Sequence, residues 1–231
     1  MNFNRWYKLK AKVLIIKIKD FFSKDKFAKI RNSQNFTHFI EIRQPFKPSS
    51  TLEQKKHNLK IAAQRIRKYV IFPGEVFSFW RAVGNPNEKE FAASRSIRKG
   101  ILLLEKGGGL CQASGIIYHL SLIAGFEIVE RFNHSKDLYT EETRFCPLGS
   151  DATVAYGYRD LRVKNNANTP VYFDLIVEDE HFYARLYSKE KLLQHDIHFE
   201  YQSKPDNILE ALTIDKTNGD IIATSVYERY E

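Results

Sequence analysis

The sequence predicts an α+β protein in which a central buried helix, beginning at Cys111, packs on a mainly antiparallel sheet. Residues 110–124 are apolar on most faces, as is typical of a helix enclosed on all sides. Short segments rich in β-branched and aromatic residues precede and follow them, with turn residues between several of these segments. A basic amphipathic helix is expected at the N-terminus.

The positive charge lies outside the predicted body. The chain has 231 residues, of which 43% are hydrophobic and 13% aromatic, enough for a packed core. Residues 1–31 hold ten Lys and Arg against two Asp, and the other 200 residues hold 26 basic and 26 acidic side chains. The net charge of +8 therefore belongs to an N-terminal arm and does not indicate a nucleic-acid-binding surface.

Residues 5–22 form the predicted N-terminal helix, with one apolar stripe at helical spacing. Two interpretations are open. The helix packs on the body with a solvated basic face, which is common in soluble proteins, or it lies on an anionic membrane with Trp6, Phe21 and Phe22 inserted. The stripe consists of Trp6, Leu9, Val13 and Ile16.

The longest apolar run of this arm, 13–16, is too short for a signal-peptide core or a membrane span. The expected location is therefore the cytoplasm, with peripheral contact at the inner membrane face as the second interpretation.

The elements before the central helix follow from periodicity and turn residues. A strand is expected at 36–42. A helix is expected from Leu52 to about Tyr69, with an inward face made of Leu52, Leu59, Ala62, Ala63 and Ile66. An aromatic-rich strand is expected at 76–80 and an apolar strand at 101–104. Gly125 is expected to end the central helix, and a strand follows at 126–131.

The second half of the chain predicts strands and turns. Strands are expected at 152–158 with 160–164, at 171–177 and at 181–187, with hairpin turns at 165–166 and 178–180. Residues 217–220 predict a turn between two short strands. The predicted organisation is an arm (1–35), an α+β domain (36–190) and a C-terminal extension (191–231).

Cys111 is the first candidate for chemistry. It lies in the first turn of the central helix, just after Gly107, Gly108 and Gly109. Unpaired N–H groups and the helix dipole favour a thiolate there, and the thiolate is the nucleophile. The backbone N–H groups of Cys111 and Gln112, with the Gln112 amide, would form an oxyanion hole. The alternative is a buried cysteine that only fills space.

His134 ends the strand that follows this helix, so it can return beside the start of the helix as a general base. The alternative is a loop histidine bonded to backbone. The base needs an orienting partner. Asp151 is favoured for that role, with Asp160, Asn165 and Asn166 as the other candidates.

The sequence gives little indication of a nucleotide-binding site, a metal site or a disulfide framework. The triple glycine lacks the Lys-Ser/Thr ending of a phosphate loop and the spacing of the dinucleotide fingerprint. The histidines are scattered and only two cysteines are present, Cys111 and Cys146, so neither a metal site nor a disulfide framework is expected. No cofactor is predicted.

Three collinear segments resemble the VanW family: FPGEVFSFWRAVGNP, GGGLCQASGIIYHLSLIAGFEIVERFNHS and GSDATVAYGYRDLRVKNNANTPVYF. They span about residues 72–173. The resemblance implies a cell-envelope or glycopeptide-resistance context in Gram-positive bacteria, and it supplies no reaction. The residues that it places inside the family's motifs are Gly107, Gly108, Gly109, Cys111, Gln112, His134, Ser135 and Asp151.

A second resemblance concerns the order of elements alone. Cysteine at a helix start, then strand, histidine and aspartate is similar to the core order of transglutaminase-like cysteine enzymes. The leading hypothesis is therefore Cys-His-Asp acyl transfer or amide hydrolysis on a peptidoglycan-precursor peptide.

The rival hypothesis is a non-catalytic binding module. In it Gly107–Gly109, Gln112 and Ser135 would recognise a cell-wall precursor or another anionic ligand. Cys111 would then serve only in packing.

Overall fold

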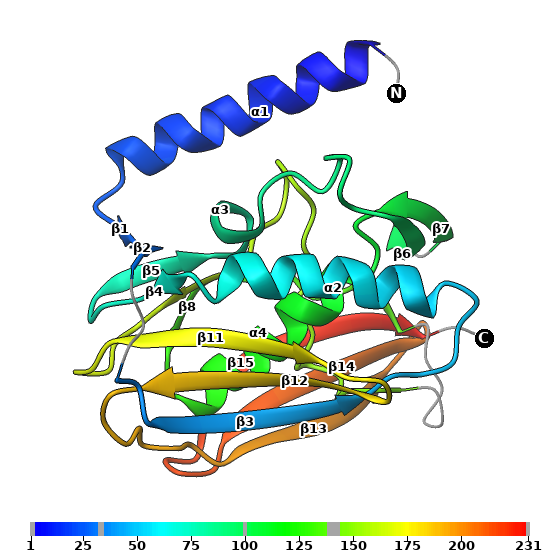
Figure 1. Ribbon diagram of the computed structural model, residues 1–231. Coiled ribbons are helices and arrows are strands. Elements are labelled where there is room, and N and C mark those ends of the chain that lie inside the picture. Colours follow the sequence, from blue (N-terminus) through cyan, green and yellow to red (C-terminus); the bar gives the residue numbers. More distant parts are fainter. Residues whose placement is uncertain (1–2, 32–34, 99–100, 138–143, 230–231) are drawn as a thin grey trace.

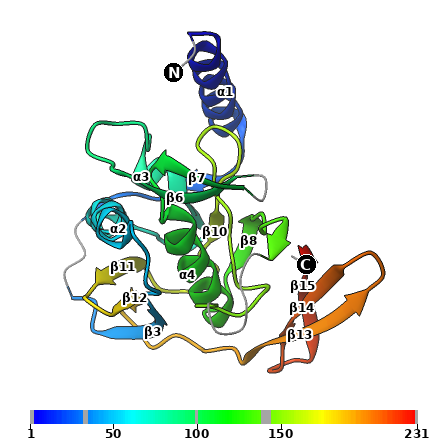
Figure 2. The same ribbon diagram turned by 90° about the vertical axis from the view of Figure 1, so that its right-hand side faces the viewer.

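The computed structural model describes residues 3–31, 35–98, 101–137 and 144–229. Their architecture is α+β, as predicted. Helix α4 (Leu110–Ile123) lies at the centre (Figures 1 and 2) and packs against strands β3, β8 and β12 and against helix α2. The prediction of a central buried helix beside mainly antiparallel strands is confirmed.

Three sheets surround α4, and most neighbouring strands in them are antiparallel. The first has the order β11 (Val171–Val177), β12 (His181–Ser188), β3 (His38–Pro45). The second has the order β1 (Lys26–Phe27), β5 (Glu75–Ser78), β10 (Arg162–Lys164), β8 (Glu127–Glu130). The third has the order β13 (Ile197–Lys204), β14 (Ile208–Asp215), β15 (Asp220–Arg229), β9 (Lys136–Asp137).

Only the short edge strands are parallel to their neighbours: β1 to β5 and β9 to β15. Two further antiparallel pairs lie outside these sheets. They are β2 (Lys29–Ile30) with β4 (Tyr69–Val70), and β6 (Ala93–Arg98) with β7 (Ile101–Lys106).

Two glycines with positive φ delimit α4. Gly109 precedes the helix at φ 98°, and Gly125 follows it at φ 66°, in the left-handed region that glycine adopts without a steric penalty. Between them Ala113, Ile116 and Ile117 are fully buried. The predicted helix, its apolar character and its glycine end are confirmed.

Helix α2 (Leu52–Ile66) covers α4 and β11. Of the predicted inward face, Leu59, Ala62, Ala63 and Ile66 are buried, whereas Leu52, at the first position of the helix, is only partly buried. The helix ends before the predicted Tyr69, which instead pairs with Ile30 in the β2–β4 ladder.

The end of the strand predicted at 76–80 is wrong. It stops at Ser78, and α3 (Phe79–Val83) begins there. The Ser78 hydroxyl accepts a hydrogen bond from the Arg81 N–H at 3.2 Å, and the Asp160 carboxylate accepts one from the Trp80 N–H at 3.0 Å. These side-chain acceptors satisfy the first turn of a helix and favour it over an extended chain.

Two other predictions also fail. Residues 152–158 form no ladder, because their one pairing is an isolated bridge between Ala155 and Arg159 across a tight turn. Asn165 does not make a hairpin turn. Its buried side chain donates to the carbonyls of Ile71 and Thr169 at 2.9 Å each. It thereby holds the end of β10 against Ile71, which forms a bridge with Val171 of β11 in another sheet.

The C-terminal segment forms the third sheet. The predicted turn at 217–220 is confirmed, but the strands on either side are longer than predicted, and β6 and β13 were not predicted at all. Strand β9, which follows His134 closely in sequence, pairs with the end of β15. The division into arm, domain and extension stays a proposal.

Helix α1 (Phe3–Phe22) confirms the predicted N-terminal helix and projects from the body in Figure 1. Asp20, largely buried, accepts from Arg162 at 2.7 Å and from Arg81 at 3.2 Å. Leu9 and Val13 lie beside Gly157. No helix among the described residues is long and apolar enough to span a bilayer.

We expect Gly108→Ala to destabilise the fold by about 1–3 kcal/mol. An added Cβ would lie 2.7 Å from the backbone oxygens of Ser94 and Arg95, and neither backbone can move without distorting β6. Gly115→Ala is the matched control. Its Cβ meets backbone at 3.4 Å or more, and alanine favours the helix, so it should be neutral or stabilising. Urea unfolding of both variants measures the difference, and equal stabilities would contradict the prediction.

Candidate active site

The Cys111 thiol lies in the first turn of α4 and is partly buried. Its Sγ lies 3.8 Å from the Thr153 hydroxyl and 3.7 Å from the Val154 carbonyl. Both belong to the extended segment 150–154, which crosses the start of the helix. The thiol is therefore held between its own helix and this segment.

Two small residues of α4 allow segment 150–154 to approach. Ser114 donates to the Ala152 carbonyl at 2.6 Å. One residue later, a Cβ at Gly115 would lie only 3.5 Å from the Asp151 Cα. The sequence Ser114-Gly115, one turn after Cys111, thus positions Asp151 close to the thiol.

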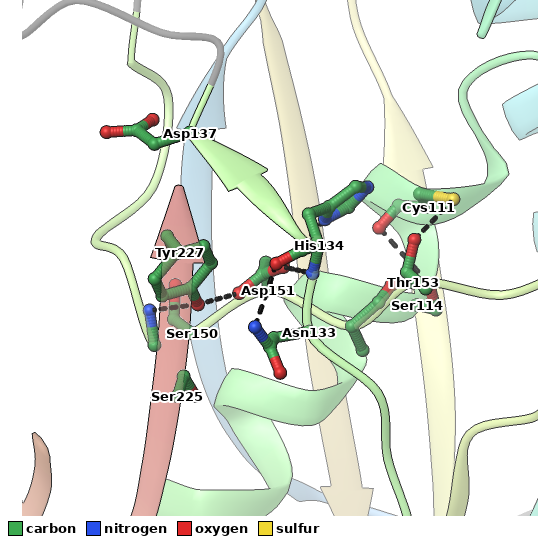
Figure 3. Close-up of polar contacts among 12 residues, drawn as sticks. Cys111, Ser114, Asn133, His134, Asp137, Ser150, Asp151, Thr153, Ser225 and Tyr227 are labelled. Carbon is green, nitrogen blue, oxygen red and sulfur yellow. Dashed lines mark hydrogen bonds and ion pairs between the residues drawn. The ribbon is translucent and has the colours of Figure 1, made fainter. Parts of the chain in front are cut away.

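Asp151 holds His134 at two points. Its Oδ2 accepts from the His134 backbone N–H at 2.7 Å and lies 2.6 Å from Nδ1 of the ring. With Nδ1 engaged, Nε2 is the ring nitrogen left for proton exchange. Figure 3 shows the His134 side chain between Asp151 and Cys111.

The other carboxylate oxygen of Asp151 has two further donors. Arg131 donates to Oδ1 at 3.1 Å, and the buried Tyr227 hydroxyl also donates to it. Arg131 in addition reaches the Asp151 carbonyl at 2.8 Å and the Ser225 hydroxyl at 2.6 Å. Sequence reasoning missed Arg131 and Tyr227, although Arg131 lies within the second segment that resembles the VanW family.

These contacts favour a charged Cys–His–Asp arrangement. Burial raises the pKa of the Cys111 thiol, but hydrogen bonding and charge from His134 lower it by more, so the pKa is below its usual value. Burial opposes the imidazolium, yet Asp151 and Cys111 raise the pKa of His134 to about 10. The pKa of Asp151 falls to about 2 despite its burial, because of His134 and Arg131.

The lowered pKa of the Cys111 thiol and the raised pKa of His134 favour the thiolate–imidazolium form of this pair over its neutral form. Cys146 behaves in the opposite way. Burial raises its pKa to about 12. The two cysteines therefore differ in character, and only Cys111 combines a histidine partner with a helix N-terminus.

The other predicted orienting residues lie elsewhere. Asp160 accepts from Ser78 and Trp80, Asn165 joins two sheets, and Asn166 is exposed. Among the candidates only Asp151 contacts His134. Ser135 is exposed, and its carbonyl accepts a hydrogen bond from the Glu228 N–H of β15 at 2.9 Å.

Gln112 does not take the predicted position at the oxyanion hole. Its N–H donates to the Gly109 carbonyl at 2.9 Å, and its buried amide donates to Gln44 at 3.1 Å. Among the described residues, the Cys111 N–H has no hydrogen-bond acceptor. Cys111 is thus the remaining backbone donor of the predicted hole.

The glycines Gly107–Gly109 shape this corner. Gly108 packs on the backbone of β6, and Gly109 packs on the side chain of Lys55, so neither position leaves room for a larger residue. Within the described parts of the chain, no group of three or more His, Cys, Asp or Glu residues is arranged to hold a metal ion.

Comparisons with known proteins identify relatives. The family described as VanW like protein matches residues 54–187. An uncharacterised protein of Bacillus subtilis, YoaR, is 36% identical over 53% of this chain and 39% of its own length. The vancomycin B-type resistance protein VanW of Enterococcus faecalis is 30% identical over 59% of this chain and half of its own length.

The chain thus spans half or less of the length of these relatives. No solved structure matches it. The matched residues 54–187 include Cys111, His134 and Asp151.

We expect the Cys111 thiol to titrate below the free value of about 8.5. In a Cys146→Ser background, the pH dependence of alkylation followed by mass spectrometry reports this one thiol. His134→Ala should move the midpoint above the free value, because burial then acts without the imidazolium. The same midpoint in both proteins would refute the coupling between Cys111 and His134.

Asp151→Asn should destabilise the protein by about 3 kcal/mol, as expected for breaking a buried ion pair. Because the pKa of Asp151 is low, its ionised carboxylate stabilises the fold above about pH 4. This stabilisation is lost as the pH falls through about 2. Because the pKa of His134 is raised, its protonated ring stabilises the fold below about pH 6.5. This stabilisation is lost as the pH rises through about 10. The difference between wild type and variant in urea unfolding should therefore peak between these limits.

Asp179→Asn, an exposed substitution in the β11–β12 turn, is the control and should show no such maximum. A pH-independent difference for Asp151→Asn would mean that the ion pair does not form.

Proposed function

Because this chain belongs to the VanW-like protein family, we propose that it is a cysteine-dependent enzyme of the cell-envelope context. The reaction is acyl transfer or amide hydrolysis on a peptidoglycan-precursor peptide. The observation that carries the proposal is the Cys111 thiol beside His134, whose Nδ1 is bound by Asp151 at 2.6 Å. The histidine lies between the nucleophile and the orienting carboxylate, which is the arrangement that activation of a cysteine by a histidine base needs.

The proposed reaction begins with attack of the Cys111 thiolate on an amide or ester carbonyl. The developing oxyanion accepts a hydrogen bond from the Cys111 N–H at the start of α4. The His134 imidazolium then gives its Nε2 proton to the leaving amine or alcohol, and the C–N or C–O bond breaks. A thioester to Cys111 and a neutral imidazole remain.

The second half of the reaction regenerates the enzyme. Neutral His134 removes a proton from water or an acceptor amine, which attacks the thioester and releases the Cys111 thiolate. Water gives hydrolysis and an amine gives transfer. Asp151 stays ionised throughout, since its pKa is about 2, and keeps Nδ1 protonated.

The substrate class rests on the relatives. One of them is a vancomycin B-type resistance protein, and resistance to that antibiotic supports a cell-wall precursor as substrate. The context of vancomycin resistance and the precursor peptide are both part of the proposal. The thiol chemistry does not depend on either.

Incubation with synthetic peptide stems of peptidoglycan precursors tests the function. We expect a peptide-derived acyl adduct on Cys111 by mass spectrometry and release of the amine product. Cys111→Ala should abolish both, and Asp151→Asn should lower the rate by at least about tenfold through misorientation of His134. Cys146→Ser is the matched control and should retain full activity.

Persistent absence of adduct and product across the peptide panel, in protein whose Cys111 reacts with small alkylating agents, would contradict the precursor as substrate. An inert Cys111 would contradict the enzyme itself and favour the binding module.

A further inference from the structure

We propose that the outward face of α1 is a membrane-binding surface that lies in the headgroup region of an anionic bilayer. The partner is thus a lipid surface, and the occupant is inferred from the distribution of apolar and charged side chains around this helix. The proposal is independent of the cysteine site.

The inward face of α1 is already used. Trp6, Leu9, Val13 and Ile16, the predicted stripe, are partly buried on the side of Asp20, which is bonded to Arg162 and Arg81. Lys12 lies over the Tyr158 ring at 3.9 Å from its centroid. These contacts fix one face of the helix on the body and determine which face remains outward.

The outward face is apolar. With about 3.6 residues per turn, its large side chains fall within one third of the helix circumference, opposite the inward stripe. Between 48% and 82% of each is exposed: Leu14, Ile15, Ile18, Phe21 and Phe22. Proteins that stay in water rarely expose a contiguous patch of this kind.

Trp6 is not part of this face, contrary to the prediction that it would insert with Phe21 and Phe22. It belongs to the inward stripe, and the Lys10 ammonium lies 3.7 Å from the centroid of its ring.

Lysines border the apolar face on both sides. The same helical geometry places Lys8 and Lys19 along one border and Lys17 along the other. Lys12 and Lys10 also fall on these borders, with their ammonium groups over the Tyr158 and Trp6 rings. Lysine stems can lie along apolar surface while their ammonium groups reach the phosphate layer. A helix that lies in the headgroup region has acyl chains beneath it and lipid phosphates on both sides. The apolar face of α1 would contact the acyl chains, and the lysines on its two borders would contact the phosphates.

The charge of the N-terminal segment favours a lipid surface over a second copy of the chain as the partner of this face. Residues 1–31 carry the entire net charge of +8, and basic residues near an anionic bilayer are attracted to its surface. A second copy of the chain would bring the same positive charge to the face and would be repelled. The charge therefore favours lipid over self-association.

Sedimentation of the full chain with vesicles tests the proposal. We expect binding to vesicles of phosphatidylcholine and phosphatidylglycerol, little binding to phosphatidylcholine alone, and weakening at high salt. The variant Ile18→Ser/Phe21→Ser/Phe22→Ser should lower the partition coefficient at least about tenfold. Lys17→Glu/Lys19→Glu should reduce binding to the anionic vesicles only.

The matched control is Leu193→Ser/Ile221→Ser, which removes two apolar side chains of similar exposure, 71% and 60%, far from α1 in sequence. It should bind as the wild type does. All the changed side chains are exposed, so we expect every variant to keep its fold. Circular dichroism checks this.

Several outcomes would overturn the proposal. These are absence of binding to the anionic vesicles, equal binding by the triple serine variant, or equal loss in the control. A dimer in sedimentation velocity that dissociates in the triple variant, without vesicle binding, would assign the face to self-association and overturn it as well.

Discussion

The buried carboxylate of Asp151 is the constraint on which the arrangement around α4 depends. A charge removed from water must be matched by donors, or the fold loses several kcal/mol. Asp151 obtains them from the His134 ring and backbone, from Arg131 and from Tyr227. Arg131 and His134 lie within 20 residues of Asp151, whereas Tyr227 is 76 residues away. Satisfying one carboxylate therefore joins the end of β8 and the segment before β9 to the distant strand β15.

The same principle operates where α1 meets the body. Asp20 is buried against Arg162, which also contacts Asp160, and Asp160 in turn accepts from Ser78 and Trp80. Here too a buried acid joins elements far apart in sequence. The structure therefore uses two carboxylate–arginine clusters as long-range connections, one beneath the candidate site and one beneath α1.

Local patterns allowed part of this to be predicted. Cys111, the glycines before it and the apolar helix after it are neighbours in sequence, and His134 follows within one supersecondary unit, so their proximity could be inferred. Arg131 and Tyr227 could not, because their roles depend on a sheet whose pairing with β9 is non-local. The strand predicted at 152–158 failed because its backbone is held by Ser114 and Phe132, and not by a neighbouring strand.

The family match covers some of the residues around the candidate site and not others. Residues 54–187 contain Cys111, His134, Asp151 and Arg131, whereas Ser225 and Tyr227 lie outside them. The histidine, its carboxylate and one arginine are thus held within the matched part. Strand β15 then supplies a hydroxyl to Asp151, another to Arg131, and the edge on which β9 pairs. The buried Tyr227 hydroxyl donates to the carboxylate and so supports the hold of Asp151 on His134. The third sheet therefore acts as a brace for the candidate base, although it contributes no group that contacts the thiol among the described residues.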